Sequence, residues 1–164
     1  MDPSEPRVVR TPSGDFDLRL PKGERDILRA LPGQLRDLLT TDDPALERLF
    51  PPAYPDDPAL NQEYEEMVRA ELTASHLTSI DVMEATIDAS RLDEEHLVAW
   101  MGAINDLRLV LGTKLDVTEE MYEEGMPDGD PRMPSFVLFT YLGWLEEQVV
   151  EALATELNGG EPGA

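Results

Sequence analysis

Histidine is the residue type most able to do chemistry near neutral pH, as a general base or a metal ligand. His76 lies four residues from both Leu72 and Ile80, on the apolar face of an expected helix. Because no second histidine and no glutamate at three-residue spacing accompanies it, this position favours a core histidine hydrogen-bonded to a polar neighbour. His96 follows Asp93 by three residues, which fits a helix first turn better than the paired Glu-x-x-His motifs of a di-metal bundle. No metal site is expected.

Other catalytic patterns are missing from the sequence. Acidic pairs such as Glu119–Glu120 point to different helix faces, and Asp128-Gly129-Asp130 lacks the rest of a calcium loop. There is no glycine-rich phosphate loop, no G-x-S-x-G and no His-Glu-x-x-His. The chain contains no cysteine, which excludes thiol catalysis, disulfides and thiolate metal sites within it. The sequence therefore predicts a protein that is not an enzyme and needs no cofactor.

Two arginines stand out because basic residues are scarce beyond residue 40. Arg108 lies in the most apolar helical pattern, and Arg69 lies one turn from Glu65. An unpaired buried charge costs several kcal/mol, so we expect one or both arginines to pair with carboxylates such as Glu65, Glu71 or Asp106. The alternative is a pocket in which Arg69 and Arg108 together bind a small anionic ligand, making the protein a ligand sensor.

The formal net charge of −22 is distributed unevenly along the chain. Residues 1–40 contain seven acidic and seven basic residues, so residues 41–164 carry the whole excess. Nucleic-acid affinity depends largely on Lys and Arg that neutralise phosphates, so this acidic body disfavours DNA binding. Its field would attract a protein partner with a basic surface.

Arg25, Arg29 and Arg36 are the candidate partner-binding residues of the N-terminal part. The pattern predicts two short helices, at 22–30 and 33–39, separated by a Pro-Gly pair that superficially resembles a helix-turn-helix. The arginines alternate with acidic residues, which favours a neutral amphipathic surface. Direct DNA binding by the first 40 residues, as in a transcriptional regulator, is the alternative.

Hydrophobic periodicity predicts a mostly α fold, a small helical bundle of three long helices with short helices and an N-terminal β-hairpin. Asp57, followed by Pro58, and Asp93 are expected helix N-caps. The helix after Asp93 is apolar around nearly its whole circumference, which is typical of a central helix. We expect a single domain at 7–157, a hairpin at 7–20, main helices at 58–88, 94–114 and 134–157, short helices at 44–49 and 118–124, an extended connector at 50–57, a disordered tail at 1–6 and a flexible tail at 158–164.

The longest apolar run, 136–145, is about half of the roughly 20 residues that a membrane-spanning helix needs, so it predicts a buried core helix. Residues 1–12 have no apolar segment like that of a signal peptide. We therefore expect a cytoplasmic protein that does not contact membranes. Methionine and aromatic positions suit either the core or a subunit interface, so a homo-oligomer remains open.

Four segments in order along the chain carry a resemblance to a known family. They are Arg48-Leu-Phe-Pro-Pro-Ala-Tyr-Pro-Asp-Asp-Pro, Glu63-Tyr-Glu-Glu-Met-Val-Arg69, the stretch from Trp100 through Asn105-Asp-Leu-Arg-Leu-Val-Leu-Gly-Thr113, and Tyr141-Leu-Gly-Trp-Leu-Glu-Glu-Gln. Together they resemble an actinobacterial family described as a domain of unknown function, DUF2017. The resemblance covers nearly the whole chain and includes no catalytic motif.

Membership of that family would imply a small helical bundle. Some members are described as transcriptional regulators linked to oxidative stress, which act with a sigma factor and use a cysteine pair as their redox trigger. Members also occur beside genes for a protease adaptor and for cysteine biosynthesis. Because this chain has no cysteine, the resemblance implies a regulatory or adaptor protein without that trigger. Its partner would be a sigma factor or a proteolysis component, contacted through protein surfaces.

Overall fold

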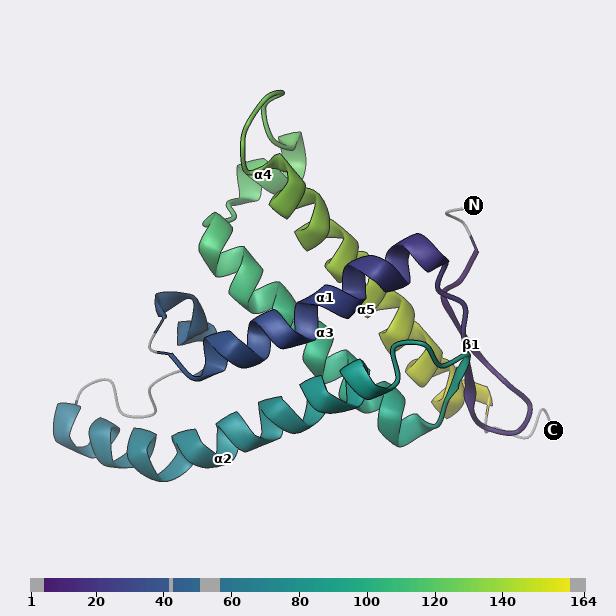
Figure 1. Ribbon diagram of the computed structural model, residues 1–164, viewed down its shortest axis with the longest axis horizontal. Coiled ribbons are helices and arrows are strands. Elements are labelled where there is room, and N and C mark those ends of the chain that lie inside the picture. The colour runs from purple at the N-terminus through teal and green to yellow at the C-terminus, as the bar shows by residue number, and fades with distance from the viewer. Residues whose placement is uncertain (1–4, 42, 51–56, 160–164) are drawn as a thin grey trace.

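The computed structural model describes residues 5–41, 43–50 and 57–159, without the side chains at positions 58, 61, 64, 65 and 156–159. Figure 1 shows a mostly helical molecule with a small sheet at one end. In chain order its elements are β1 (Val8–Arg10), β2 (Phe16–Leu18), α1 (Lys22–Leu39), the 3-10 helix η1 (Pro44–Leu49), α2 (Pro58–Ala85), β3 (Arg91–Leu92), α3 (Glu94–Leu115), α4 (Glu119–Glu124) and α5 (Met133–Gly159).

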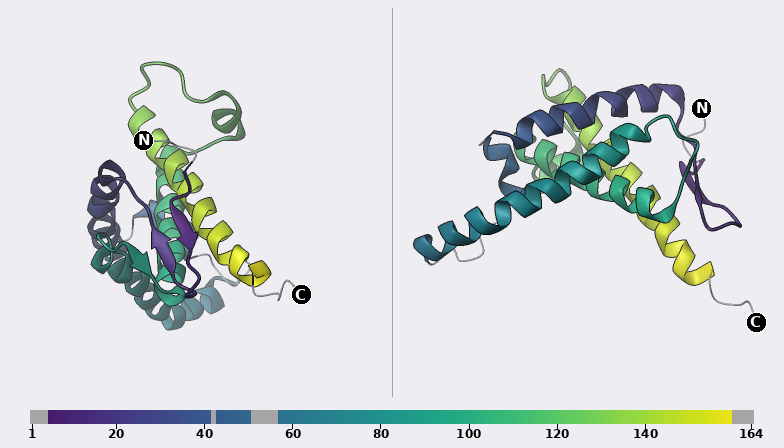
Figure 2. Two further views of the ribbon diagram at one scale, coloured as in Figure 1. Left: turned by 90° about the vertical axis from the view of Figure 1, so that its right-hand side faces the viewer. Right: turned by 60° about the horizontal axis from the view of Figure 1, so that its bottom comes forward.

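Helix α3 is the centre of the fold because apolar side chains cover most of its circumference. Trp100 and Ile104 are completely buried in it. It packs against α5 on one side and α2 on another, and it also contacts η1. Figures 1 and 2 show α5 running alongside α3 in roughly the opposite direction, with α1 crossing them. The predicted bundle of three long helices is confirmed, with its central member correctly identified.

The helix starts agree with the sequence prediction because short polar side chains cap them. The Asp57 side chain accepts a hydrogen bond from the Leu60 amide at 3.1 Å, and Pro58 occupies the first helical position. The Asp93 side chain likewise accepts from the His96 amide at 2.8 Å. Each cap satisfies a backbone donor that has no partner within the helix.

Helix α1 corrects the expectation of two short helices, because it continues without a break through Pro32. Proline in a helix interior removes a hydrogen bond and costs about 3 kcal/mol in isolation. Here Leu28, Pro32, Leu35 and Leu39 are all buried on one face. Burial of that face against the bundle outweighs the local preference for a break, so the helix-turn-helix interpretation is wrong.

The predicted hairpin is confirmed, and it belongs to a three-stranded antiparallel sheet of order β1-β2-β3. Val8 pairs with Leu18 in the hairpin, whose turn includes Gly14 with a φ of 95°. That left-handed conformation favours glycine. The third strand, which was not predicted, pairs Leu92 with Phe16. Its two residues are too few for a period-two pattern to show.

Other boundaries follow the prediction within a few residues. Helix α2 ends at Ala85, three residues before its expected end, and α5 continues two residues beyond 157. The middle of the expected connector, 51–56, and the outer parts of both expected tails, 1–4 and 160–164, lie outside the described residues. Among the described helices, none combines the length and the apolarity needed to cross a bilayer.

Two apolar clusters hold the helices together. The larger one joins the sheet, α1, η1, α2, α3 and α5. The smaller one consists of Leu115, Met126, Phe136 and Phe139, and it holds α4 and the following loop against the end of the bundle. This second cluster places α4 beside α3 and α5, where the candidate site lies.

Candidate functional site

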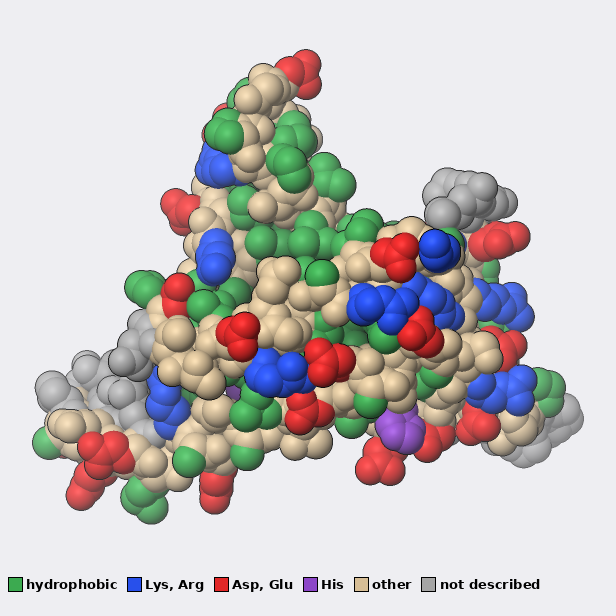
Figure 3. Space-filling model, in the orientation of Figure 1, with side chains coloured by type: hydrophobic (Ala, Val, Ile, Leu, Met, Phe, Trp, Pro, Cys, Tyr) green, Lys and Arg blue, Asp and Glu red, His purple; other side chains and the backbone are tan. Residues whose placement is uncertain are grey.

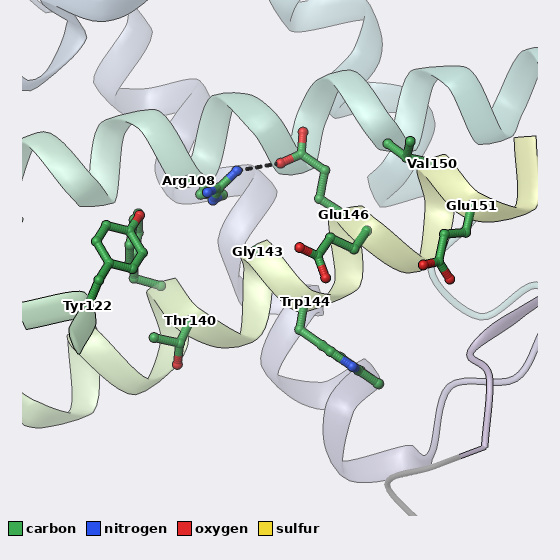
Figure 4. A pocket seen from close by; sticks show the side chains of 10 residues that line it. Arg108, Tyr122, Thr140, Gly143, Trp144, Glu146, Val150 and Glu151 are labelled. Atoms are coloured by element: carbon green, nitrogen blue, oxygen red, sulfur yellow. Dashed lines mark hydrogen bonds and ion pairs between the residues drawn. The ribbon is translucent and has the colours of Figure 1, made fainter. Parts of the chain in front are cut away.

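Arg108 projects from α3 towards α5, where it meets a carboxylate (Figure 4). Its Nη1 donates a hydrogen bond to Glu146 Oε2 at 2.9 Å, and its Cζ lies 5.6 Å from the centre of the Phe139 ring. The sequence predicted that this arginine would pair with a carboxylate, but other carboxylates were expected as its partner. Glu146 belongs to a helix 38 residues further along the chain, so local spacing does not reveal it.

Gly143 allows the Arg108 guanidinium to lie directly against α5. A Cβ atom at position 143 would be 3.2 Å from Arg108 Nε and 3.6 Å from Cζ. The distance to Nε is shorter than an ordinary van der Waals contact, so a side chain at position 143 would push the guanidinium outward. The glycine and the arginine therefore form one fitted unit on the α3–α5 interface.

A pocket of about 740 Å³ lies beside this unit, between α3, α4 and α5. Tyr122 of α4 contributes one wall, and its ring contacts Phe139 edge-on at 5.8 Å between centroids. Trp144 and Val150 add further apolar surface from α5 (Figure 4). Three glutamates of α5 complete the lining, at positions 146, 147 and 151. We call this site the α3–α5 pocket.

Arg69 occupies a different part of the molecule. Its Cζ lies 4.3 Å from the centre of the Phe50 ring, which is within the range of a cation–π contact. The α3–α5 pocket is lined by Arg108 and not by Arg69. The structure therefore does not bring the two arginines to one pocket. The side chain of Glu65, the predicted neighbour of Arg69, lies outside the described residues.

His76 is hydrogen-bonded to a polar neighbour within the core, as its position on an apolar helix face predicts. Its Nδ1 lies 2.6 Å from Asp106 Oδ2, which joins α2 to α3. The Phe50 ring contacts the imidazole edge-on at 5.6 Å. The hydrogen bond with Asp106 raises the pKa of His76, and it outweighs the opposing effect of burial. Asp106, proposed above as an arginine partner, serves the histidine instead.

The three N-terminal candidate arginines all make contacts within the chain. Arg25 donates to the backbone carbonyl oxygens of Leu18, Leu20 and Ile87, at 3.0, 3.1 and 2.6 Å. Its guanidinium thus fixes the start of α1 to the sheet and to the end of α2.

Arg29 and Arg36 join α1 to the last turns of α2 and the segment after it. Arg29 donates two hydrogen bonds to Asp88, at 2.7 and 2.8 Å. Arg36 Nη2 donates to Asp81 at 2.7 Å and to Glu84 at 2.9 Å. Figure 3 shows basic and acidic side chains next to one another along this face. These ion pairs neutralise the charges of both arginines where α1 packs against α2.

One buried network was not predicted. Arg7 is 4% exposed, and its Nη2 donates to Glu24 Oε2 at 2.9 Å. Tyr141 Oη donates to the other oxygen of Glu24 at 2.7 Å, and the Arg7 guanidinium lies over Trp144 at 5.0 Å. Burial, together with the hydrogen bond to Glu24, raises the pKa of Tyr141 above its ordinary value. The partners lie 17 and 117 residues apart along the chain, so no local pattern indicates them.

Metal chemistry has no support among the described residues, where no three His, Asp or Glu side chains form a group able to hold a metal ion. The geometry offers instead a pocket with apolar walls and carboxylates. It lies beside the buried ion-pair network, because Trp144 lines the pocket and also lies under the Arg7 guanidinium.

Comparison with known proteins gives the family. The chain is 32% identical over 130 residues to a Mycobacterium leprae protein named "Putative oxidative stress regulator AosR". That match covers 68% of this chain and 59% of the relative, so the chain spans little more than half of that protein. No solved structure matches the chain significantly. The model of the family described as "Domain of unknown function (DUF2017)" matches residues 3–153, and the chain therefore belongs to the DUF2017 family.

Proposed function

We propose that this protein is a non-enzymatic regulator that acts in a stress response by binding another protein through its acidic surface. The observation that carries the proposal is the internal pairing of the candidate DNA-binding arginines. Arg25 binds backbone carbonyls, while Arg29 and Arg36 bind carboxylates of the same chain. The name of the mycobacterial relative supports a role in oxidative stress regulation.

The internal pairs make DNA a poor partner. A phosphate backbone is bound by Lys and Arg side chains that are free to neutralise it, and each contact would here require a pair to break. The remaining charge excess is negative, with 35 acidic against 13 basic residues. Such a surface steers basic partners towards it, over a range of about 8 Å at physiological ionic strength.

A component of the transcription machinery, such as a sigma factor, or of a proteolysis system is the partner class that the family resemblance suggests. Either would need a basic surface to complement this chain. Because the chain has no cysteine, oxidation of a thiol within it cannot be the trigger of such a response.

Affinity capture with the tagged full-length protein tests the proposal. We expect a basic protein to be retained at low salt, to be released as salt is raised, and to bind the purified protein directly in calorimetry. A parallel DNA-binding titration at low salt should show no binding. Tight DNA binding, with a steep salt dependence that weakens in an Arg29→Gln/Arg36→Gln variant, would overturn the proposal in favour of direct DNA recognition.

A further inference from the structure

The α3–α5 pocket exposes large apolar side chains together with carboxylates. Tyr122 is 57% exposed and Val150 is 46% exposed, although both are large apolar side chains. Glu147 and Glu151 of the same lining are also exposed, and they make no ion pair with any described residue. The pocket therefore presents exposed apolar side chains together with two carboxylates that no described basic residue neutralises.

The charge of the lining selects against anions. Arg108 is the single basic residue of the lining, and Glu146 already neutralises it at 2.9 Å. Glu147 and Glu151 then leave the pocket with a net negative charge. An anionic metabolite would be repelled, whereas a guanidinium or ammonium group would meet carboxylates and the faces of aromatic rings.

The shape of the site indicates an extended occupant. Its α5 lining runs from Phe139 to Glu151, which is about 18 Å of helix at 1.5 Å per residue. That length exceeds a single side chain and matches a three-turn helix or about five extended residues. A second copy of this chain is a poor candidate, because its net charge of −22 would meet an acidic rim.

We infer that the α3–α5 pocket docks a basic, apolar segment of a partner protein. Lysine or arginine side chains of that segment bind Glu147 and Glu151, and two large apolar side chains of the segment pack at opposite ends of the pocket, one against Tyr122 and the other against Val150. This inference rests on the proposed protein-binding function and assigns it a place on the molecule.

A synthetic peptide provides the probe. We would titrate the full-length protein with a fluorescein-labelled amphipathic peptide of lysine and leucine, about 12 residues long to match the pocket, and follow fluorescence anisotropy. A glutamate and leucine peptide of the same length is the charge control. We expect the basic peptide to bind and the acidic peptide not to bind.

Charge-matched variants locate the binding site. Glu147→Lys/Glu151→Lys reverses the pocket rim, and Glu66→Lys/Glu71→Lys makes the same change in net charge at exposed positions of α2. We expect the pocket variant to weaken peptide binding at least about tenfold, a difference of about 1.4 kcal/mol, and the α2 variant to weaken it much less. Equal weakening by both variants, or no weakening by either, would overturn the inference.

Tryptophan fluorescence gives a local readout. Trp100 is completely buried, whereas Trp144 lines the pocket, so acrylamide should quench mainly Trp144. The peptide contains no tryptophan, and its binding should reduce this quenching. Binding that leaves the quenching unchanged would place the peptide elsewhere and contradict the assignment.

The same variants separate this inference from the proposed function. If the pocket variant retains the captured partner as well as the unchanged protein does, the protein-binding function stands and the pocket assignment fails. If the unchanged protein retains no partner, the proposed function itself fails. Self-association that disappears in Tyr122→Ala would assign the pocket to a second copy and overturn the inference.

Discussion

Nη2 of Arg7 lies 2.9 Å from Oε2 of Glu24, joining the residue before β1 to the first turn of α1. The two side chains are only 5% and 13% exposed. Breaking such a pair leaves one buried charge without a partner, which costs about 3–5 kcal/mol. Because Tyr141 also donates to Glu24, the pair holds the sheet, α1 and α5 together.

Arg7→Ala should therefore lower the free energy of unfolding by about 3 kcal/mol or more, as measured by urea denaturation. Arg19→Ala is the matched control, because Arg19 forms a 3.6 Å pair with Asp17 in which its side chain is 57% exposed. The control should cost less than about 1 kcal/mol. Similar losses in both variants would show that the buried pair has no special importance.

Arg25 and Arg29 should differ in the same kind of experiment. Arg25→Gln removes a guanidinium that donates to three backbone carbonyl oxygens, and we expect a loss of about 2 kcal/mol or more. Arg29→Gln removes an exposed pair with Asp88, and we expect a much smaller loss. If Arg25→Gln leaves stability unchanged, its contacts do not hold the start of α1, and a role in partner binding gains support.

Two glycines of the helices should respond to alanine in opposite directions. A Cβ at Gly112 would lie 3.0 Å from Phe139 Cε2, so Gly112→Ala should overpack the α3–α5 contact and cost about 1–3 kcal/mol. A Cβ at Gly33 would meet nothing within 4 Å, so Gly33→Ala should stabilise α1 by about 0.5–1 kcal/mol. Thermal unfolding of the two variants checks both signs.

The His76–Asp106 hydrogen bond predicts a pH dependence of stability. Because folding raises the pKa of His76, its contribution is complete below the unfolded pKa of about 6.5 and is lost as pH rises through the higher folded pKa. The unfolding free energy lost in His76→Gln should therefore be larger at about pH 5.5 than at about pH 8.5. Urea titrations of both proteins at the two pH values measure this, and a constant difference would contradict it.

The sequence was sufficient where local chemistry decides the structure. Asp57 and Asp93 carry the short polar side chains that cap helices, and both cap one in the structure. The apolar circumference after Asp93 likewise identified the central helix. These features depend on residues within one or two helical turns of each other, so they can be predicted from the local sequence.

The missed features depend on contacts between distant segments. Pro32 suggests a helix break, yet burial against the bundle keeps α1 continuous. The pairing of Leu92 with Phe16 and that of Arg108 with Glu146 join segments that local patterns cannot relate. The α3–α5 pocket was unrecognisable for the same reason, because the ligand pocket that the sequence suggested combined Arg108 with Arg69, which does not line this one.

The contact between Gly143 and Arg108 limits which pairs of residues related sequences can carry at these two positions. Glycine in the interior of a helix destabilises the fold by about 0.5–1 kcal/mol relative to alanine. Gly143 nevertheless lies in the middle of α5. The closeness of Arg108 Nε, at 3.2 Å from the position of a Cβ, gives the glycine a reason to persist. Relatives that carry a larger residue at position 143 should therefore lack the arginine at position 108. A substitution at either position would then indicate that this wall of the pocket has a different shape.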